Sequence, residues 1–357
     1  MSQTKSRPQL NLIFLAGDGI GPEITSATKS VLSAVSSICN KSIEVTNADI
    51  GLKALETSGC TIPDTVRENV KQADGVILGP VSHNAYPPIT EGGLNPSGIL
   101  RKDLDLFANI RPARVWEGVP RFSAKPFHLT IMRENLEGFY ADRNMHQGSG
   151  EFMPDPNTAL AFRKITRHAS TRIAEASFLH AQKNGFDRVT AVHKANVMRV
   201  TDGLFLECCR DVAAKFPDIA YDEMLVDAAA AHLVRNPNAF GVIVTTNMFG
   251  DILSDLASEL SGGLGVAGSL NLGHSYAMAQ AQHGSAPDIA GKGIANPTSL
   301  ILSLAMLLHH LGEERASTAI ETAMIKTLPH SKTKDLGGTH ATEGFTKALI
   351  ESIQGIN

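Results

Sequence analysis

Short apolar runs alternate along this chain with longer segments in which apolar residues recur at helical spacing. Runs of consecutive aliphatic residues that end at glycine, proline or polar turns predict buried strands. They cover 10–15, 74–79, 127–132, 188–193 and 241–245. Apolar positions three and four residues apart predict long helices at 163–183 and 202–216. Strands that alternate with helices predict the α/β fold class.

Segment 141–160 follows neither period and is rich in glycine, proline and polar residues. We expect it to form an arm or hairpin rather than an element of the core. No internal repeat or low-complexity tract interrupts the rest of the pattern.

Composition narrows the class of protein. The 357 residues, 43% hydrophobic and 19% charged, are ordinary for a globular protein of two domains or one large one. A net charge of −4 does not indicate binding to nucleic acid, and no apolar run reaches the length of a membrane span. The first eight residues are polar, unlike a signal peptide, and the four cysteines lack disulfide or metal spacing. We therefore expect a cytoplasmic protein with reduced thiols.

The helix predicted after strand 241–245 carries Asp251 and Asp255. Because these carboxylates are four residues apart, they lie on one helix face, one turn from each other. Their oxygens suit a hard divalent cation, Mg²⁺ or Mn²⁺, which would relieve the repulsion between two like charges. An acidic first turn favoured by the helix dipole is the competing interpretation.

Two glycine-rich segments are candidate ligand loops. The turn 17–23 follows the first strand, but its G-x-G-x-G spacing differs from the dinucleotide fingerprint, and Pro22 removes a backbone N–H. We expect this tight turn to line a different site. In loop 283–297, His283 can hydrogen-bond a base or ribose, and Asp288 can bind ribose hydroxyls while repelling a 2′-phosphate. An ordinary surface loop is the alternative.

Arg101, Arg111 and Arg133 lie in or beside apolar segments, where a buried guanidinium needs an anionic partner. Together they would bind a di- or tricarboxylate, although each taken singly fits a structural salt bridge equally well. Tyr140 follows the third arginine, and Lys194 follows strand 188–193. A lysine at a strand end becomes a general base when its surroundings lower its pKa, but most such lysines are surface residues.

With these residues placed, the chain resembles the β-decarboxylating dehydrogenases of the isocitrate, homoisocitrate and 3-isopropylmalate dehydrogenase family over essentially its full length. The motifs that carry the resemblance are GDGIGPE at 17–23, LRK at 100–102, NIRP at 109–112, REN at 133–135 with Tyr140, HKAN at 193–196, VD at 226–227, the pair Asp251 and Asp255, and 283–297.

The resemblance implies an isopropylmalate/isocitrate dehydrogenase-like α/β fold. A large domain from both chain ends, 1–109 and 259–357, would bind the cofactor, and a small domain, 110–258, would carry a dimerisation arm. The family resemblance also implies a homodimer with shared active sites, in which Lys194 and Asp227 reach into the partner's site.

The implied reaction is oxidation of a 3-substituted (R)-malate by NAD, with loss of CO₂ assisted by Mg²⁺ or Mn²⁺. Lys194 would accept the hydroxyl proton, and Tyr140 would protonate the enolate carbon. The resemblance assigns catalysis to Tyr140 and Lys194; substrate binding to Asn95, Ser97, Arg101, Arg111 and Arg133; cofactor binding to His283, Gly284, Ser285, Ala286, Asp288, Ile289 and Asn296; and metal binding to Asp227, Asp251 and Asp255.

Cofactor and substrate preference depend on a few positions. NADP enzymes of the family tend to have Lys-Tyr where this chain has Asp288-Ile289, so we expect NAD. Asn95 and Ser97 suit a γ-carboxylate better than an isopropyl group, which favours isocitrate. Segments 226–228 and 232–237 resemble isopropylmalate enzymes instead. Gln280 stands where the family often has Glu, so the sequence does not determine how the nicotinamide end of the cofactor is bound.

Other functions stay open. The alternative substrates are 3-isopropylmalate, homoisocitrate, tartrate and D-malate. A regulatory subunit without turnover and a metal-dependent lyase are alternatives from different classes. Retention of both catalytic residues and all three metal-binding aspartates argues against a regulatory subunit.

Overall fold

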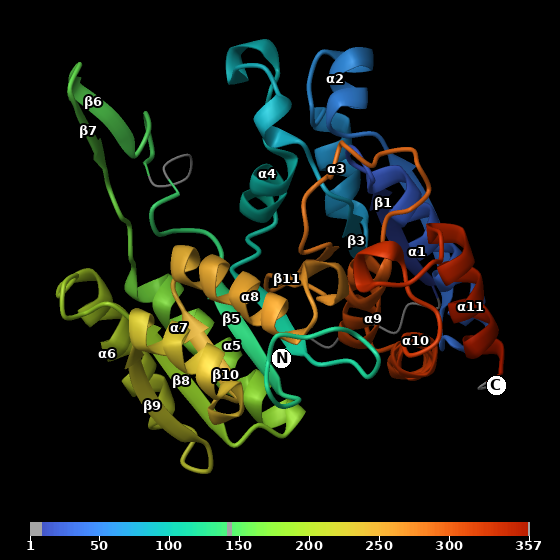
Figure 1. Ribbon diagram of the computed structural model, residues 1–357. Helices are drawn as coiled ribbons and strands as arrows, with labels where there is room; N and C mark the ends of the chain where they lie inside the picture. The colour runs from blue at the N-terminus through green and yellow to red at the C-terminus, as the bar shows by residue number, and fades with distance from the viewer. Residues whose placement is uncertain (1–8, 141–144, 356–357) are drawn as a thin grey trace. The chain divides into compact units, whose positions relative to one another are not determined.

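The computed structural model describes residues 9–140 and 145–355, and the chain divides into two compact units (Figure 1). Unit 1 comprises Met1–Leu104, Trp116–Pro120 and Leu264–Asn357. Unit 2 comprises Asp105–Val115 and Arg121–Gly263. Each unit has its own strands, helices and hydrophobic core.

Five strands of unit 1 are hydrogen-bonded in the order β2-β1-β3-β12-β11. Their bounds are β1 Gln9–Leu15, β2 Ser42–Ala48, β3 Gly75–Leu78, β11 Leu270–Leu272 and β12 Ala277–Gln280. Neighbouring strands are parallel except β11 and β12, which are antiparallel. The continuous aliphatic runs of β1 and β3 suit this arrangement, because a central parallel strand is buried on both faces.

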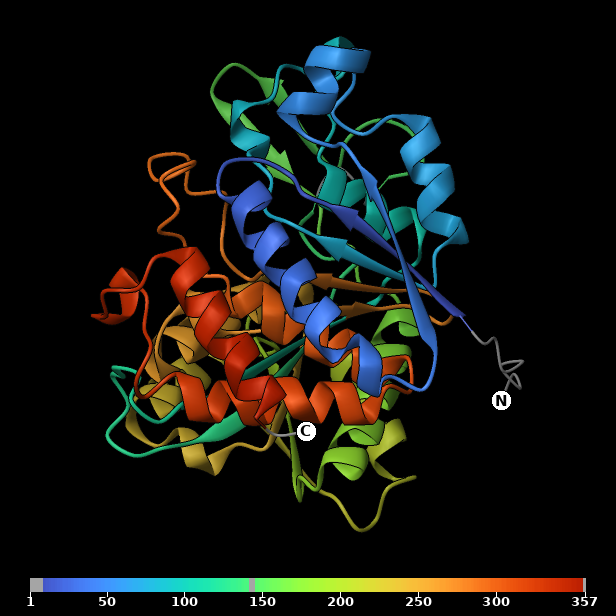
Figure 2. The same ribbon diagram turned by 90° about the vertical axis from the view of Figure 1, so that its right-hand side faces the viewer.

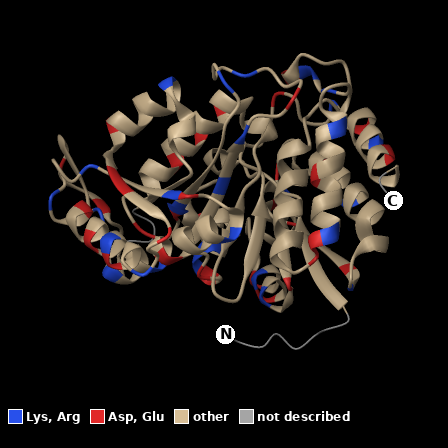
Figure 3. Ribbon diagram, turned by 90° about the horizontal axis from the view of Figure 1, so that it is seen from below, with Lys and Arg blue, Asp and Glu red and all other residues tan. Residues whose placement is uncertain are grey.

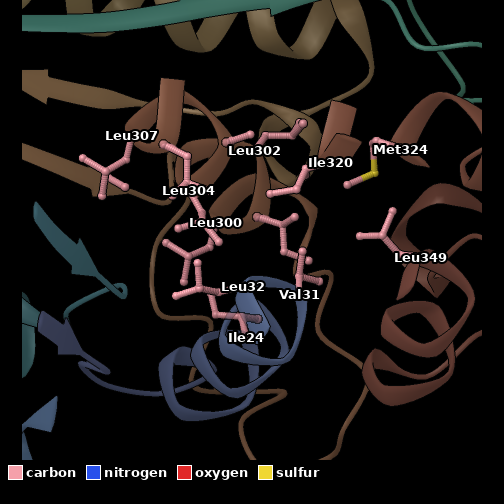
Figure 4. Close-up of a cluster of buried hydrophobic side chains, with 14 of the residues drawn as sticks. Ile24, Val31, Leu32, Leu300, Leu302, Leu304, Leu307, Ile320, Met324 and Leu349 are labelled. Atoms are coloured by element: carbon pink, nitrogen blue, oxygen red, sulfur yellow. The ribbon is translucent and has the colours of Figure 1, made fainter. Parts of the chain in front are cut away.

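Four helices build the main core of unit 1: α1 Gly21–Val35, α9 Thr298–His310, α10 Glu314–Thr327 and α11 Thr342–Gln354. The leucine-rich helix α9 is almost entirely buried. Its residues Leu300 and Leu304 belong to one cluster with Ile24 and Val31 of α1 and Met324 of α10 (Figure 4). Figure 2 shows α1 beside α11, which contributes Leu349 to the same cluster.

The remaining helices of unit 1 are short: α2 Leu52–Ser58, α3 Asp64–Gln72 and α4 Pro96–Asp103. Helix α4 begins where Asn95 caps it, since the Asn95 side chain accepts a hydrogen bond from the Gly98 N–H at 3.3 Å. Pro96 at the first helical position fits this start. The single-turn 3₁₀ helices of the two units are η1 Ser36–Ile38, η2 His83–Ala85, η3 Ile89–Glu91, η5 Pro237–Ala239, η6 Leu264–Val266 and η7 Lys334–Leu336.

Unit 2 has a second set of five strands, in the order β4-β5-β10-β8-β9. Their bounds are β4 Ala108–Arg114, β5 His128–Glu134, β8 Arg188–His193, β9 Ala220–Leu225 and β10 Val242–Thr245. β4 and β5 are antiparallel, and the other neighbours are parallel. The carboxyl ends of β5, β10, β8 and β9 therefore lie along the same edge.

Two helix layers cover the two faces of these strands. The helices are α5 Arg167–Asn184, α6 Thr201–Ala213, α7 Val226–Arg235 and α8 Asn247–Ser261. Ile131 of β5 joins Leu253 of α8 in a core cluster, whereas its neighbour Thr130 is hydrogen-bonded to His180 of α5 at 3.2 Å. Because adjacent strand residues point to opposite faces, α5 and α8 pack on opposite sides.

A two-stranded hairpin, β6 Glu151–Asp155 and β7 Thr158–Ala161, extends away from the rest of unit 2 (Figure 1). The rings of Phe152 and Phe162 lie at a tilt to each other with centroids 5.6 Å apart, and Met153 is 63% exposed. The predicted hairpin within 141–160 is thus confirmed, apart from residues 141–144, which lie outside the described residues.

The predicted α/β class is confirmed, as are strands in all five predicted runs. Helix α5 begins at Arg167 rather than 163, because the Thr166 hydroxyl caps it by accepting from the Ala169 N–H at 3.1 Å. Charges of both signs are interspersed along the helices of both units (Figure 3). Among the described residues, no helix is both long and apolar enough to cross a membrane.

Helix α8 can lie close against β5 because residue 250 is glycine. A Cβ added at Gly250 would meet Cγ and Cβ of Arg133 at 2.6 and 2.7 Å. Those atoms belong to the fixed base of a buried side chain rather than to its flexible end. A methyl group at position 250 would therefore displace either α8 or Arg133.

We predict that Gly250→Ala destabilises the protein by about 1–3 kcal/mol, because overpacking forces backbone or side-chain shifts. The free energy of unfolding in urea measures this change.

The matched control is Gly203→Ala in helix α6, where an added Cβ meets nothing within 4 Å. Removing a helical glycine at an open position should stabilise the protein by about 0.5–1 kcal/mol. If both variants are stabilised equally, the close approach of α8 to Arg133 is not a constraint.

Candidate functional site

The strand register of unit 2 places two arginines on one face. Arg111 of β4 is paired with Ile131 of β5, and Asn109 is paired with Arg133. Residues two apart on a strand, and residues paired across strands, share a face. Arg111 and Arg133 therefore both lie on the Ile131 face, which is the face that α8 covers.

Helix α8 presents two carboxylates to these guanidinium groups. Arg111 Nη1 donates to Asp251 at 3.1 Å and to Asp255 at 3.3 Å, and Arg133 Nη1 also donates to Asp251. The same Arg111 nitrogen donates to the Ser254 hydroxyl at 2.7 Å. The two aspartates thus share one helix face, as their spacing predicts.

The hydroxyl of Tyr140 joins this cluster. It accepts a hydrogen bond from Arg133 Nη2 at 2.6 Å and donates to Asp251 Oδ2 at 3.1 Å. The guanidinium of Arg133 also lies 5.6 Å from the centre of the tyrosine ring. A hydroxyl held between a cation and a carboxylate has a fixed orientation, which a proton donor needs.

Two neutral amides hold the arginines in place. Arg111 Nε donates to Asn109 Oδ1 at 2.5 Å, and Arg133 Nε donates to Asn247 Oδ1 at 2.9 Å. Asn247 in turn donates to the Glu137 carbonyl at 2.8 Å, which fixes the amide's orientation. The amides occupy the Nε side of each arginine without neutralising its charge.

Burial is the main influence on the charge of this arginine pair. Burial and the nearby Arg133 cation lower the pKa of Arg111 to about 10, while Asp251 and Asp255 act in the opposite direction. That pKa keeps the group cationic at neutral pH. Two buried cations on one face form a strong site for an anion with several carboxylates.

Lys194 and Asp227 meet because they leave adjacent parallel strands at the same edge. His193 ends β8 and is paired with Leu225, which ends β9. Lys194 Nζ donates to Asp227 Oδ1 at 2.5 Å, and this hydrogen bond lowers the pKa of the Asp227 carboxyl. In 9–140 and 145–355, no hydrogen bond or ion pair joins this pair to Tyr140 or to the carboxylates of α8.

A buried ion pair fixes the backbone at Lys194. Asp202, fully buried, accepts from the Lys194 N–H at 2.6 Å and from Arg163. Arg163 also donates to Thr246, the residue before helix α8, at 3.0 Å. The Arg163–Asp202 pair therefore links the lysine turn to the start of the helix that carries the aspartate pair.

Unit 1 holds the substrate-binding residues predicted on helix α4. Ser97 and Arg101 are four residues apart and share a helix face. Both bond Gln280, the last residue of β12. Arg101 Nη2 donates to its Oε1 at 3.0 Å, and Ser97 Oγ lies 3.1 Å from its Nε2 and 3.3 Å from its Oε1. Asn95, predicted as a substrate ligand, caps α4 with its carbonyl oxygen and is exposed.

The predicted cofactor loop contains an unusual buried nitrogen. His283 Nδ1 lies 2.9 Å from the Gly284 carbonyl, so Nδ1 carries the hydrogen and Nε2 is an acceptor. Nε2 is buried and has no hydrogen-bond partner among the described residues. Burial lowers the pKa of His283, which favours this neutral form. A ligand that donates to Nε2, such as an adenine amino group, would satisfy it.

The glycine turn 17–23 packs against this loop. Ile20 N–H donates to the Ser285 carbonyl at 2.9 Å, and a Cβ at Gly19 would lie 2.0 Å from the same oxygen. Ser285 is buried and its hydroxyl accepts from Ser82 at 2.7 Å. The turn supports the ligand loop in the described structure, which explains its need for glycine.

The other predicted cofactor residues differ in exposure. Asp288 is exposed and Ile289 is half-buried against the core of unit 1. Gly284 is exposed, and the neighbouring Ala286 has a positive φ of 40°. Asn296 is buried: it donates to Asp335 at 2.9 Å and accepts from the N–H of Thr298, the first residue of α9, at 3.0 Å.

The residues on α8 fit the divalent metal ion that the family resemblance implies. Side chains of Asp251 and Asp255 are 42% and 49% exposed, whereas those of Arg111 and Arg133 are 8% and 2% exposed. Two accessible carboxylates on one face suit a hard divalent cation. Among the described residues, no three His, Cys, Asp or Glu side chains of this chain gather around one point. Asp227 thus belongs to a separate pair here.

Sequence reasoning missed several residues that organise the site. Asn109 was identified only as part of the NIRP motif, Ser254 was given no role, and Asp202 lay within a predicted helix. Gln280 was noticed only as a departure from a family pattern. These residues act through partners 100 or more positions away in several cases, such as Arg111 with Ser254. Such pairs cannot be predicted from the local periodicity of the sequence.

Comparisons with known proteins agree on one family. Residues 11–353 match the family described as isocitrate/isopropylmalate dehydrogenase. The chain is 40% identical over 353 residues to NAD isocitrate dehydrogenase catalytic subunit 5, mitochondrial, of Arabidopsis thaliana, which covers 98% of this chain and 90% of that protein. It is 41% identical over 339 residues to the 3-isopropylmalate dehydrogenase of Archaeoglobus fulgidus, covering 95% and 98%.

A solved structure has the same architecture. The isocitrate dehydrogenase of Methylococcus capsulatus matches with a TM-score of 0.87 at 36% identity, over 97% of this chain and 99% of that one.

Proposed function

This chain belongs to the isocitrate/isopropylmalate dehydrogenase family, and we propose that it oxidises isocitrate with NAD and releases CO₂. Members of the family are dehydrogenases of small molecules that use NAD or NADP and a divalent metal ion. The relatives' names divide among isocitrate, 3-isopropylmalate and homoisocitrate. The reaction type is therefore common to all candidates, and the substituent at C3 is the open choice.

The observation that carries the proposal is the buried arginine pair beside Tyr140 and the aspartates of α8. Arg111 and Arg133 bind carboxylates of the malate core, since each offers a fork of donors at a dry surface. Their contacts with Asp251 in this chain support the geometry of such binding. Arg101 binds a further carboxylate of the substrate.

Two groups move protons. Tyr140 donates to the enolate carbon after CO₂ leaves, and the cation of Arg133 against its oxygen stabilises the phenolate that remains, which regains a proton before the next turnover. Lys194 accepts the proton of the 2-hydroxyl as a neutral amine, and Asp227 orients the ammonium group that results. The buried Arg163–Asp202 pair keeps the Lys194 backbone in position.

Mg²⁺ or Mn²⁺ would be held by Asp251 and Asp255 together with Asp227. When bound, the cation polarises the 2-hydroxyl and its neighbouring carboxylate and stabilises the negative charge that develops as CO₂ leaves. The protein supplies charged oxygen ligands on a rigid helix, positioned by Arg111 and Ser254.

NAD is the proposed cofactor. The loop 283–297 offers the unsatisfied Nε2 of His283 for the adenine, and Gly284, Ser285 and Ala286 allow close approach. Exposed Asp288 accepts from ribose hydroxyls and repels the 2′-phosphate of NADP. Ile289 and Asn296 complete the loop.

Isocitrate is preferred over 3-isopropylmalate because the wall formed by Asn95, Ser97 and Gln280 is polar. An isopropyl group buried there could not form hydrogen bonds with this polar wall, which costs binding energy. Homoisocitrate has the same chemistry with one more methylene, and so is the nearest alternative. Tartrate and D-malate have no carboxyl-bearing substituent at C3.

We propose a homodimer whose copies share active sites. Large apolar side chains are exposed around the Lys194 turn, on α7 and on α8, as expected of a surface covered by a second copy. They include Val197, Val200, Val234 and Ile252, at 69%, 85%, 58% and 59% exposure. In that dimer, Lys194 and Asp227 act in the partner's site. The expected cytoplasmic location stays a prediction, since relatives include a protein named as mitochondrial.

A non-catalytic role is the second candidate. One relative is named as a regulatory subunit of the NAD isocitrate dehydrogenase. Such a subunit would bind ligand without turnover. The retention of Tyr140, Lys194 and three aspartates, two of them in contact with the arginine pair, favours catalysis.

The first prediction for this function concerns substrate and cofactor. With Mn²⁺ and either NAD or NADP, the purified protein should reduce NAD fastest with isocitrate, ahead of homoisocitrate, 3-isopropylmalate, tartrate and D-malate. Absorbance of the reduced nicotinamide measures kcat/KM for each. A higher kcat/KM for 3-isopropylmalate contradicts the substrate assignment, and no turnover with any substrate supports the regulatory candidate.

The second prediction concerns the metal ion. Chelation should abolish activity, and Mn²⁺ or Mg²⁺ should restore it. Asp251→Asn should raise the metal concentration for half-maximal activity at least about tenfold, because a charged oxygen ligand becomes a neutral amide. Asp218→Asn, the same change at an exposed position of unit 2, should not. Full activity in chelator would refute the mechanism.

The third prediction concerns the shared site. Lys194→Met and Arg101→Met proteins should each be nearly inactive, but co-refolding the two should restore roughly a quarter of wild-type activity. About half of the dimers are then mixed, and each mixed dimer has one intact site and one doubly altered site. If subunits demonstrably exchange without recovery, each site is built from a single chain.

A further inference from the structure

The loop that follows β5, residues 134–140, brings two residues of the proposed site into direct contact. Arg133 lies in β5, and its Nη2 donates to the Tyr140 hydroxyl at 2.6 Å. The chain must therefore turn back within this loop, so that the tyrosine returns to the strand that the chain has just left. The proposed mechanism uses Arg133 and Tyr140 but gives no role to the residues between them.

Glu134, the last residue of β5, forms the turn. Its side chain is buried, and its two oxygens accept hydrogen bonds from the N–H groups of Leu136 at 2.8 Å and Glu137 at 3.0 Å. A carboxylate that binds the N–H groups two and three residues ahead folds the backbone over its own side chain. The strand therefore ends at Glu134, and the chain reverses there.

The second half of the loop is bonded to neighbouring elements of unit 2. Asn247 of α8 donates to the Glu137 carbonyl at 2.8 Å and accepts from Arg133 Nε at 2.9 Å. Gly138 exchanges two backbone hydrogen bonds with Lys164, at 2.8 and 3.0 Å. The same amide thus holds Arg133 and the backbone that leads to Tyr140.

The position of Glu134 requires two acceptor oxygens. Burial raises the pKa of the Glu134 carboxyl to about 7, while the two backbone donors lower it. A buried carboxylate costs free energy unless its oxygens are hydrogen-bonded. Glutamine would avoid the buried charge, but it has one acceptor oxygen, and its NH₂ group would face a backbone N–H. Glutamate is therefore the side chain of this length that can accept from both N–H groups.

We propose that Glu134 is a positioning residue, which folds loop 134–140 so that the Tyr140 hydroxyl lies against Arg133. The inference rests on the proposed function in one respect, because Tyr140 is the proposed proton donor to the enolate carbon. Glu134 acts through the backbone of the loop and, in this proposal, has no direct part in the chemistry.

The kinetic test is Glu134→Gln, assayed above about pH 8 with the best substrate, where the wild-type carboxyl is ionised. The new NH₂ group faces a backbone N–H and disturbs the turn. We expect kcat to fall about 10- to 100-fold, because a small misplacement of a catalytic group is that costly. KM for the substrate should change at most about threefold, since Arg133 keeps its partners on α8. An unchanged kcat overturns the proposal.

A double-mutant cycle tests whether Glu134 acts through the tyrosine. In a Tyr140→Phe background, Glu134→Gln should lower kcat at most about threefold further, because the hydroxyl that it positions is already absent. An equal fall in both backgrounds would mean that Glu134 affects Arg133 or the fold in general, and would overturn the proposal. Glu207→Gln makes the same chemical change at an exposed position of α6 and should leave kcat unchanged in both backgrounds.

Circular dichroism and thermal unfolding check that each variant folds. If Glu134→Gln does not fold, Glu134→Asp takes its place, because aspartate keeps both acceptor oxygens on a side chain one methylene shorter. Its kcat should fall about threefold to tenfold, and this fall should also disappear in the Tyr140→Phe background. A fall that persists there, or no fall, overturns the proposal.

NMR of tyrosine isotopically labelled at Cζ keeps the inference separate from the proposed reaction. The chain has four tyrosines, and Tyr140→Phe identifies the resonance of Tyr140. Without substrate, Glu134→Gln should shift or broaden that resonance and leave those of Tyr86 and Tyr276, both in unit 1, unchanged. An unchanged Tyr140 resonance in the folded variant overturns the inference whatever the activity. A shifted resonance in a protein that oxidises no substituted malate overturns only the proposed reaction.

Discussion

Two buried guanidinium groups on one face of a sheet are the constraint on which this protein's site depends. The antiparallel register of β4 and β5 puts Arg111 and Arg133 on the same side, away from water. Buried cations must be compensated, and the nearest available element is α8. Its residues Asp251 and Asp255 pair with the arginines, and Ser254 accepts a hydrogen bond from Arg111. Gly250 leaves the space that the Arg133 side chain occupies.

The positions of the proposed catalytic groups follow from the same set of strands. Because β5, β10, β8 and β9 are parallel, each delivers the residues that follow it to one edge, where ligands bind in open α/β sheets. Arg133, the start of α8, Lys194 and Asp227 all lie at those strand ends. The Arg163–Asp202 pair links the end of β8 to the end of β10, so the residues that follow these two strands are held in fixed positions.

Neutral amides have a recurring purpose in this molecule. Asn109 and Asn247 hold the arginines of unit 2, and Gln280 holds Arg101 of unit 1. Each amide restricts a guanidinium to one orientation while leaving its charge for an anion. A carboxylate is present instead where a negative charge is needed, as at Asp251, which is proposed to bind the metal ion. This division suits the proposed binding of a polyanionic substrate by orientation as well as by charge.

The sequence alone determined the α/β class, the five buried strands, the hairpin after Tyr140 and the family, because these depend on local periodicity and on short motifs. It also located the arginines and the aspartate pair. Only the tertiary structure decided their partners: Asn109 for Arg111, Asn247 for Arg133, Gln280 for Ser97 and Arg101. The physical reason is that strand register and helix packing bring together residues far apart in the chain, and the hydrogen bonds formed there depend on a geometry that no local pattern of residues encodes.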